Sequence, residues 1–224
     1  MTKISIIICA FNRAKTLESL LDCLLDQEGV NFAYEVIVVD NNSKDRTRQI
    51  VESFIPKFKG RLRYLFEPQQ GKPFALNLGI RESQGEVLAY IDDDCLVQKD
   101  YLTQVHKVFQ ENREIDFIGG KIQPHWEGDC PLWLSKVLLD QTEYALSDER
   151  YCRRVFFRGP LAILDYGEKP FQVDNIQKGY SAFLFYGPNM AIKKSALNKV
   201  GGYAPERIIT QDTEMCLRLI RLGM

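Results

Sequence analysis

Three consecutive carboxylates, Asp92, Asp93 and Asp94, follow an apolar run in the stretch VLAYIDDDCLV. Adjacent negative charges repel one another, and burying one of them without a partner is unfavourable. Mg²⁺ or Mn²⁺ resolves such repulsion, because these ions prefer one or two carboxylates together with phosphate oxygens. In an extended segment Asp92 and Asp94 share a face, which suits one acid on a ribose or metal-bound water and one on the metal. The alternative is an ordinary solvated turn.

Alternating strands and helices must position these acids. Apolar and β-branched runs predict strands at residues 4–10, 34–40, 61–67, 86–92 and 115–122. Helical spacing of leucines and other apolar residues predicts helices at residues 14–27, 45–55, 73–83 and 100–112. Asp45 is the expected N-cap of the second helix, and Pro73 suits the first turn of the third. This alternation implies a doubly wound α/β fold, with a Rossmann-like, mostly parallel sheet covered by helices on both faces.

The pattern loosens after about Pro124, where residues 153–171 suggest loops and short antiparallel strands. Regularity returns at residues 187–203, which predict a turn, a short strand and a helix ending at Gly201 and Gly202. The last segment has helical spacing, and its core-facing residues are expected to be Met215, Cys216, Leu219, Ile220 and Leu222. Because a helix that ends in glycine usually leads into another element, we expect a chain truncated at its C-terminus.

Composition excludes some function classes. The 29 basic and 30 acidic residues nearly cancel, so no basic excess indicates a nucleic-acid partner. The six cysteines show no CxxC pair and no metal-ligand spacing, which predicts reduced thiols in a cytoplasmic protein. No stretch approaches the roughly 18 apolar residues that span a bilayer.

Polar residues cluster where the predicted strands end. The first strand runs into Ala10, Phe11, Asn12 and Arg13, and the second ends at Asp40. Ligands of open α/β sheets bind outside the carboxyl ends of the strands, so these residues and the three acids should meet at one ligand site. Phe11 as a core residue and Asn12 as a turn residue are the structural alternatives.

Six segments, in order, resemble the family-2 glycosyltransferases, which are inverting enzymes of the GT-A fold. They are SIIICAFNRAKTL, VIVVDNNSKDRT, GKPFALNLGI, GEVLAYIDDDC, GPNMAIKKSALNKVGGY and TQDTEMCLRL. The resemblance covers nearly the whole chain. Gln211 departs from the family pattern, because a glutamate often precedes the catalytic aspartate there.

The resemblance implies one GT-A catalytic domain over residues 1–224, with a nucleotide-binding half at 1–123 and an acceptor-side half at 124–224. It implies a nucleoside diphosphate sugar, by default with uridine, bound by Ala10, Phe11, Asn12, Arg13, Asp40, Lys72, Asp92 and Asp93. Asp94, with Asp92, would hold Mn²⁺ or Mg²⁺. Asp212 would be the base that takes a proton from a saccharide or glycolipid hydroxyl. The implied setting is polysaccharide or glycolipid assembly, with peripheral association at the inner face of the membrane.

Two other functions stay open. A nucleotide-sugar-binding domain that has lost turnover is consistent with Gln211 and the early stop. A sugar-phosphate nucleotidyltransferase normally has a glycine-rich, basic loop after the first strand, which CAFNRAKT lacks. Asp212 as a helix cap and Lys72 as a residue that merely precedes a helix are the structural alternatives at these positions.

Overall fold

A computed structural model of the chain describes residues 3–120, 122, 125, 128, 156–158, 163–165, 187–206 and 211–222. The chain divides into two compact units, Met1–Gly119 with Leu184–Met224, and Gly120–Phe183. These two units do not test the predicted nucleotide-binding half at 1–123 and acceptor-side half at 124–224, so that division stays a prediction. Within the described ranges, no helix is long and apolar enough to cross a membrane.

The first unit is built on a six-stranded sheet with the order β3-β2-β1-β4-β8-β5. Its strands are β1 (Ile4–Ala10), β2 (Tyr34–Asp40), β3 (Leu62–Phe66), β4 (Val87–Tyr90), β5 (Phe117–Gly119) and β8 (Met190–Lys193). Neighbours among β1 to β4 pair in parallel, whereas β8 pairs antiparallel with both β4 and β5. The predicted α/β fold with a mostly parallel sheet is confirmed.

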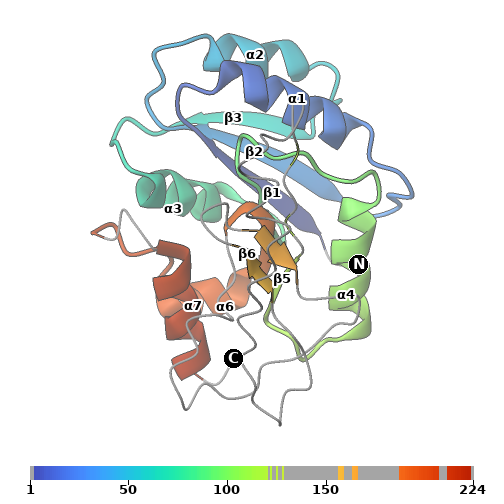
Figure 1. Ribbon diagram of the computed structural model, residues 1–224, viewed down its shortest axis with the longest axis vertical. Helices are drawn as coiled ribbons and strands as arrows, with labels where there is room; N and C mark the ends of the chain where they lie inside the picture. Colours follow the sequence, from blue (N-terminus) through green and yellow to red (C-terminus); the bar gives the residue numbers. More distant parts are fainter. Residues whose placement is uncertain are drawn as a thin grey trace. The chain divides into compact units, whose positions relative to one another are not determined.

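Helices cover both faces of this sheet. They are α1 (Ala14–Leu25), α2 (Thr47–Phe54), α3 (Lys72–Glu82), α4 (Tyr101–Glu111), α6 (Lys194–Val200) and α7 (Gln211–Arg221), with a 3₁₀ turn at Gly187–Asn189 before β8. Figure 1 shows α1 and α2 on one face of β1 to β3, and α3 on the other. In the second unit, β6 (Phe156–Arg158) pairs antiparallel with β7 (Ile163–Asp165), as expected for residues 153–171.

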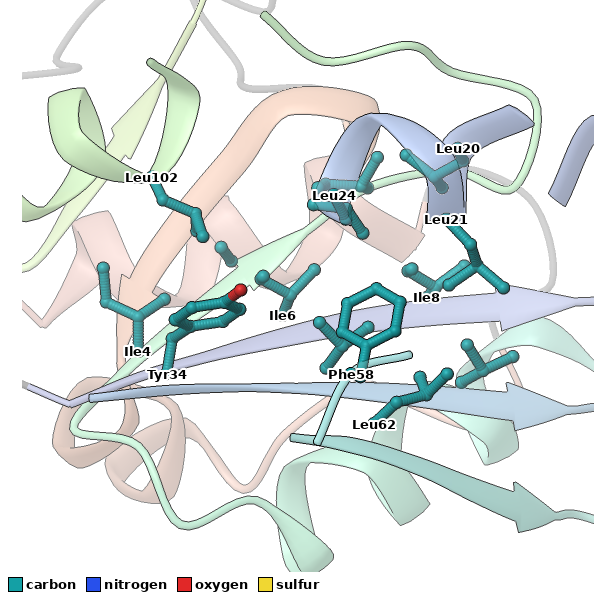
Figure 2. Close-up of a cluster of buried hydrophobic side chains, with 14 of the residues drawn as sticks. Ile4, Ile6, Ile8, Leu20, Leu21, Leu24, Tyr34, Phe58, Leu62 and Leu102 are labelled. Carbon is teal, nitrogen blue, oxygen red and sulfur yellow. The ribbon is translucent and has the colours of Figure 1, made fainter. Parts of the chain in front are cut away.

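The two-residue period of β1 explains how one strand serves two cores. Ile4, Ile6 and Ile8 are completely buried and belong to the cluster that α1 covers. Figure 2 shows Ile6 and Ile8 facing Leu24 and Leu21 of α1, and Ile4 beside Tyr34. Ile7 points the other way, into a second cluster with residues of α3, α6 and α7. Each fully buried aliphatic side chain contributes about 1.5–3 kcal/mol.

The second cluster fixes α7. Met215, Cys216 and Leu219 are fully buried on one face of this helix, and Cys216 Sγ lies 3.9 Å from Met190 Sδ of β8. Leu222, which helical spacing placed in the core, is instead 56% exposed, because α7 ends at Arg221 and the chain leaves the apolar face there. The first turn of α7 is thereby held near β4 and α3.

Candidate functional site

The carboxyl ends of the parallel strands meet at one edge, as expected. Ala10 of β1 lies opposite Asp40 of β2, and Ile7 lies opposite Tyr90, the last residue of β4. Ala10 is 1% exposed and belongs to the core cluster under α1. The loops after these strands carry most of the predicted site residues.

The three acids lie in a turn rather than on an extended strand. β4 ends at Tyr90, two residues earlier than predicted, and Cys95 N–H donates to the Asp92 carbonyl at 3.1 Å. The expectation of an extended strand through these acids is therefore wrong, whereas a shared side for Asp92 and Asp94 stays a prediction. The side chains diverge: Asp92 contacts Lys72, whereas Asp93 Oδ2 accepts the Phe11 backbone N–H at 3.4 Å.

Lys72 and Asp92 form a close ion pair. Lys72 Nζ lies 2.5 Å from Asp92 Oδ1, and the side chains are 33% and 28% exposed. Burial of Lys72 disfavours its charge, but the Asp92 carboxylate outweighs this and raises the pKa of Lys72 to about 12. Lys72 is therefore a permanent cation at the start of α3. Gly71 before it has a φ of +138°, which side chains rarely adopt.

Asp93 is a partly buried acid next to a second carboxylate. Burial and the Asp94 carboxylate raise the pKa of Asp93 to about 6, against the lowering effects of the Phe11 N–H and Arg13. Asp94 itself is exposed. In the part of the chain that the structure describes, no three His, Cys, Asp or Glu side chains gather into a metal-binding group. A divalent ion that takes one or two carboxylates and completes its shell with phosphate and water still fits this turn, and would relieve its charge.

Asn12 joins the loops that follow β1 and β2. It has a φ of +56°, its backbone N–H donates to Ser43 Oγ at 2.9 Å, and its Oδ1 accepts the Lys44 N–H at 2.7 Å. This is the turn-closing role that the sequence left open. Phe11 is 46% exposed, so the alternative core role for this ring is wrong.

Asp45 supports the same pair of loops. Its Oδ1 accepts the Thr47 N–H at 2.9 Å, and its Oδ2 accepts the Ala14 N–H at 3.1 Å. The prediction that Asp45 is the N-cap of α2 is wrong, because α2 begins at Thr47 and Arg46 occupies that position; Asp45 lies one residue earlier and still accepts the N–H of Thr47. The carboxylate also supplies an acceptor to the first residue of α1.

Asp40 is 2% exposed and bonded on both oxygens. Its Oδ1 accepts the Ser43 N–H at 2.9 Å, and its Oδ2 accepts the Tyr64 hydroxyl at 2.8 Å. These bonds give it a structural role in shaping the loop after β2. Its predicted contact with a base stays a prediction.

Sequence reasoning missed the role of Asn41, which is 4% exposed. Its Nδ2 donates to the carbonyls of Glu67 at 3.3 Å and Gln69 at 2.7 Å, while its Oδ1 accepts the Gly71 N–H at 2.8 Å. Asn41 therefore holds the loop that delivers Lys72 to the site. The available signal was an amide residue directly after a buried strand, where backbone groups need partners.

Asp212 meets the Lys72–Asp92 pair at one small cavity of about 10 Å³. The polar walls of the cavity are Cys9, Lys72, Tyr90, Asp92, Tyr203 and Asp212. Ile7, Leu76 and Ile91 complete it. Burial raises the pKa of the Cys9 thiol, so this cysteine stays protonated. Cys9, Cys23, Cys95 and Cys216 form no disulfide bond, whereas Cys130 and Cys152 lie outside the described residues.

Arg218 fixes the helix that carries Asp212. Its guanidinium donates to both oxygens of Glu214 at 2.8 Å, to the Gly202 carbonyl at 2.7 Å and to the Val200 carbonyl. These carbonyls lie at the end of α6, where backbone acceptors lack helical partners. Arg218 thus ties α7 to α6, and Glu214 holds the guanidinium in place for this contact.

Sequence comparison identifies relatives of known class. The profile described as Glycosyl transferase family 2 matches residues 5–201. The glycosyltransferase AglE of Haloferax volcanii is 31% identical over 120 residues, which cover 54% of this chain and 39% of AglE. The match therefore spans well under half of that relative.

Solved structures share the fold at low identity. The Staphylococcus aureus TarS fragment 1–349 in complex with UDP matches with a TM-score of 0.68 and 19% identity, over 97% of this chain and 54% of TarS 1–349. The mannosyltransferase PcManGT of Pyrobaculum calidifontis, in complex with GDP-Man and Mn²⁺, also matches with a TM-score of 0.68 and 19% identity, over 99% of this chain and 53% of PcManGT. These matches confirm the expected GT-A type of fold.

Proposed function

The chain belongs to glycosyl transferase family 2, and from this premise we propose that it moves a sugar from a nucleoside diphosphate sugar to a hydroxyl acceptor, with inversion. The observation that carries the proposal is that Lys72, Asp92 and Asp212, from three distant segments, line one cavity. A fixed cation beside two carboxylates supplies the charge for a diphosphate and a base for a hydroxyl.

Asp212 is the proposed general base. The acceptor oxygen forms a bond to the anomeric carbon while the bond from that carbon to the diphosphate oxygen breaks. The acceptor proton passes to the Asp212 carboxylate, and the diphosphate leaves with the bonding electrons. A positioned base contributes roughly 10²–10⁴-fold to the rate. A single displacement of this kind inverts the configuration at the anomeric carbon.

The nucleotide is proposed to lie along the carboxyl edge of the sheet. The exposed ring of Phe11 is available to stack on the base, and the backbone of residues 10–13 borders it. Asp40 has two hydrogen bonds on a group with about four lone-pair sites, so it retains acceptor capacity for a base N–H. Lys72 adds positive charge beside the diphosphate.

Asp94, with Asp92, is proposed to hold Mn²⁺ or Mg²⁺. The raised pKa of Asp93 is consistent with this assignment, because its causes are burial and, after it, the neighbouring Asp94 carboxylate, whose charge a cation would offset. When bound, such an ion supplies Lewis-acid neutralisation of the departing diphosphate. Asp93 remains on the other side of the turn, against the Phe11 N–H, where it orders the loop that faces the donor.

The identities of the donor and of the acceptor are part of the same proposal. Binding of UDP by TarS supports UDP as the first nucleotide to test, and binding of GDP-Man by PcManGT supports GDP as the second. The proposed acceptor is a saccharide or glycolipid hydroxyl.

The test combines binding with turnover. Thermal unfolding is measured with Mn²⁺ and UDP or GDP, since a ligand at 100 times its Kd stabilises the folded state by about 2.7 kcal/mol. Hydrolysis of UDP-N-acetylglucosamine and GDP-mannose is then compared between the wild type and Asp212→Asn. We expect both proteins to bind the same nucleoside diphosphate, and only the wild type to turn over the donor. Asp26→Asn, at a surface ion pair with Lys99, is the control.

Each rival function has its own outcome. Binding without turnover that depends on Asp212 indicates a nucleotide-sugar-binding domain. Consumption of a nucleoside triphosphate together with a sugar phosphate indicates a nucleotidyltransferase.

A further inference from the structure

Two buried tyrosines stand beside the proposed base. Tyr90, at the end of β4, is 2% exposed, and Tyr203, after α6, is 1% exposed. Both line the cavity that Asp212 also lines. Their rings meet edge to face, with centroids 5.8 Å apart and planes at 80°.

Neither hydroxyl has a partner of normal hydrogen-bond geometry in the part of the protein that the structure describes, although the two phenols interact with each other. Within the described ranges, Tyr90 Oη and Tyr203 Oη are buried and form no hydrogen bond of normal geometry with another protein atom. An unsatisfied buried hydroxyl destabilises the folded state by about 1–3 kcal/mol. Phenylalanine would fill the same apolar cluster without that cost, so packing alone does not explain two hydroxyls at one cavity.

The cavity has the size and the walls for one water molecule. Its volume of about 10 Å³ corresponds to roughly one water probe, and a buried water needs two to four polar partners. The two hydroxyls and the Asp212 carboxylate provide them. Burial raises the pKa values of Tyr90 and Tyr203 well above the ordinary range, so both phenols keep the protons that they can donate.

We propose that Tyr90 and Tyr203 are positioning residues of the transfer reaction, which orient the Asp212 carboxylate through one ordered water in this cavity. The water accepts hydrogen bonds from both phenols and donates one to Asp212. The carboxylate is thereby held in one rotamer, with its other oxygen directed to the acceptor hydroxyl. This inference rests on the proposed function, since it concerns residues that surround the proposed base.

The kinetic test uses three matched tyrosines. Tyr101 also has a buried hydroxyl without a hydrogen bond of normal geometry, but it does not line the cavity and packs against the cluster on the opposite face of the sheet. In Mn²⁺-dependent hydrolysis of UDP-N-acetylglucosamine and GDP-mannose, we expect Tyr90→Phe and Tyr203→Phe each to lower kcat about tenfold. That is less than the roughly 10²–10⁴-fold effect of losing a base. The donor KM should not change, and Tyr101→Phe should match the wild type.

A second measurement needs no donor. If a water links Tyr203 to Asp212, Tyr203→Phe lowers the unfolding midpoint in urea, and this loss shrinks in the Asp212→Ala background, because alanine leaves the water without its acceptor. Tyr101→Phe should give the same midpoint shift in both backgrounds. Equal shifts for Tyr203→Phe in the two backgrounds would overturn the proposal, even for a chain that hydrolyses no donor.

The two hypotheses fail in different ways. Donor turnover that survives Asp212→Asn refutes the general base and leaves the urea measurement to report on the water link. Loss of turnover in Asp212→Asn, combined with wild-type kcat in both tyrosine variants, refutes only the positioning role. An ordered water bonded to both phenols and to Asp212 in a crystal structure of the chain would support it directly.

Discussion

Asn77 and Tyr203 hold each other by a reciprocal pair of hydrogen bonds. Asn77 Nδ2 donates to the Tyr203 carbonyl, and the Tyr203 N–H donates to Asn77 Oδ1, both at 2.8 Å. Asn77 lies on α3, the helix that begins with Lys72. One helix therefore sets the position of the cation at its start and of the segment that carries Tyr203.

Gly201 and Gly202 offer a matched test of this arrangement. Both have a φ of +76°, but a Cβ on Gly202 would lie 2.6 Å from Asn77 Oδ1, whereas a Cβ on Gly201 would have no neighbour within 4 Å. Alanine in the left-handed region costs about 1–2 kcal/mol at either position. We expect Gly202→Ala to lose a further 1–3 kcal/mol or so, because it displaces the Asn77 amide. Urea unfolding measures both losses.

The variants Gly201→Ala and Gly202→Ala also distinguish an effect on stability from an effect on donor turnover. Gly202→Ala should also lower donor turnover, since Tyr203 follows directly, while Gly201→Ala should leave turnover unchanged under conditions where both proteins are folded. Equal unfolding free energies for the two variants would show that the Asn77 contact contributes nothing.

Removal of the Lys72 charge should weaken nucleotide binding. Lys72→Met deletes the cation and leaves Asp92 without its partner, so we expect the Kd for UDP with Mn²⁺ to rise about tenfold to a hundredfold, the range for a lost hydrogen bond to a charged group. Isothermal titration measures the change. Lys44→Met is the control, because Lys44 Nζ donates to Asn42 Oδ1 and, in the part of the chain that the structure describes, forms no ion pair with an acid. Similar Kd values for the two variants would count against Lys72 as a phosphate contact.

The sequence predicted the edge of the sheet at which these residues gather, because parallel strands end on one side whatever the details of their loops. It did not predict the turn after Tyr90. Apolar periodicity continues through Ile91, and nothing in the pattern marks where hydrogen bonding to β1 stops. The position of β8 between β4 and β5 could not be predicted from the sequence either. Residues 190–193 are separated from both neighbouring strands by long segments, so tertiary packing decides how they pair.

Arg218 should matter more for stability than its surface-like residue type suggests. Arg218→Met leaves the Glu214 carboxylate and two carbonyls at the end of α6 without their donor, so we expect a loss of about 2–3 kcal/mol in unfolding free energy. Arg221→Met, on the exposed end of the same helix, should change it by less than about 0.5 kcal/mol. Chemical unfolding compares the two. A small effect at Arg218 would mean that apolar packing alone holds α7.

Residue type alone also did not predict the different structural roles of Asp40 and Asn41. Both follow the buried run of β2, and a ligand role was natural for an acid at a strand end. The structure uses Asp40 to hold Ser43 and Tyr64, and Asn41 to hold the loop before Lys72. These partners are 3 to 30 residues away in sequence, and no local pattern specifies which backbone groups will need them.

The buried carboxylate of Glu35 should make the free energy of unfolding depend on pH. This carboxylate is 5% exposed and accepts from Ser5 Oγ and the Gln84 N–H, both at 2.7 Å, and from Arg63 at 3.1 Å. Burial raises the pKa of Glu35, but these hydrogen bonds outweigh it and hold the pKa below the ordinary value. The ionised group therefore stabilises the fold above the unfolded pKa of about 4.3, and this contribution is lost as pH falls through the lower folded pKa.

Glu35→Gln should accordingly be less stable than the wild type by about 1–3 kcal/mol at pH 7. The difference should shrink below about pH 4, because the wild-type carboxylate becomes protonated there and the glutamine does not titrate. Unfolding free energies from urea titrations at several pH values measure this convergence. Glu52→Gln is the control: its ion pair with Arg48 at 2.7 Å joins side chains that are 48% and 66% exposed, so it should change stability by less than about 1 kcal/mol. A difference at Glu35 that stays constant down to pH 3 would show that the carboxylate charge does not stabilise the fold.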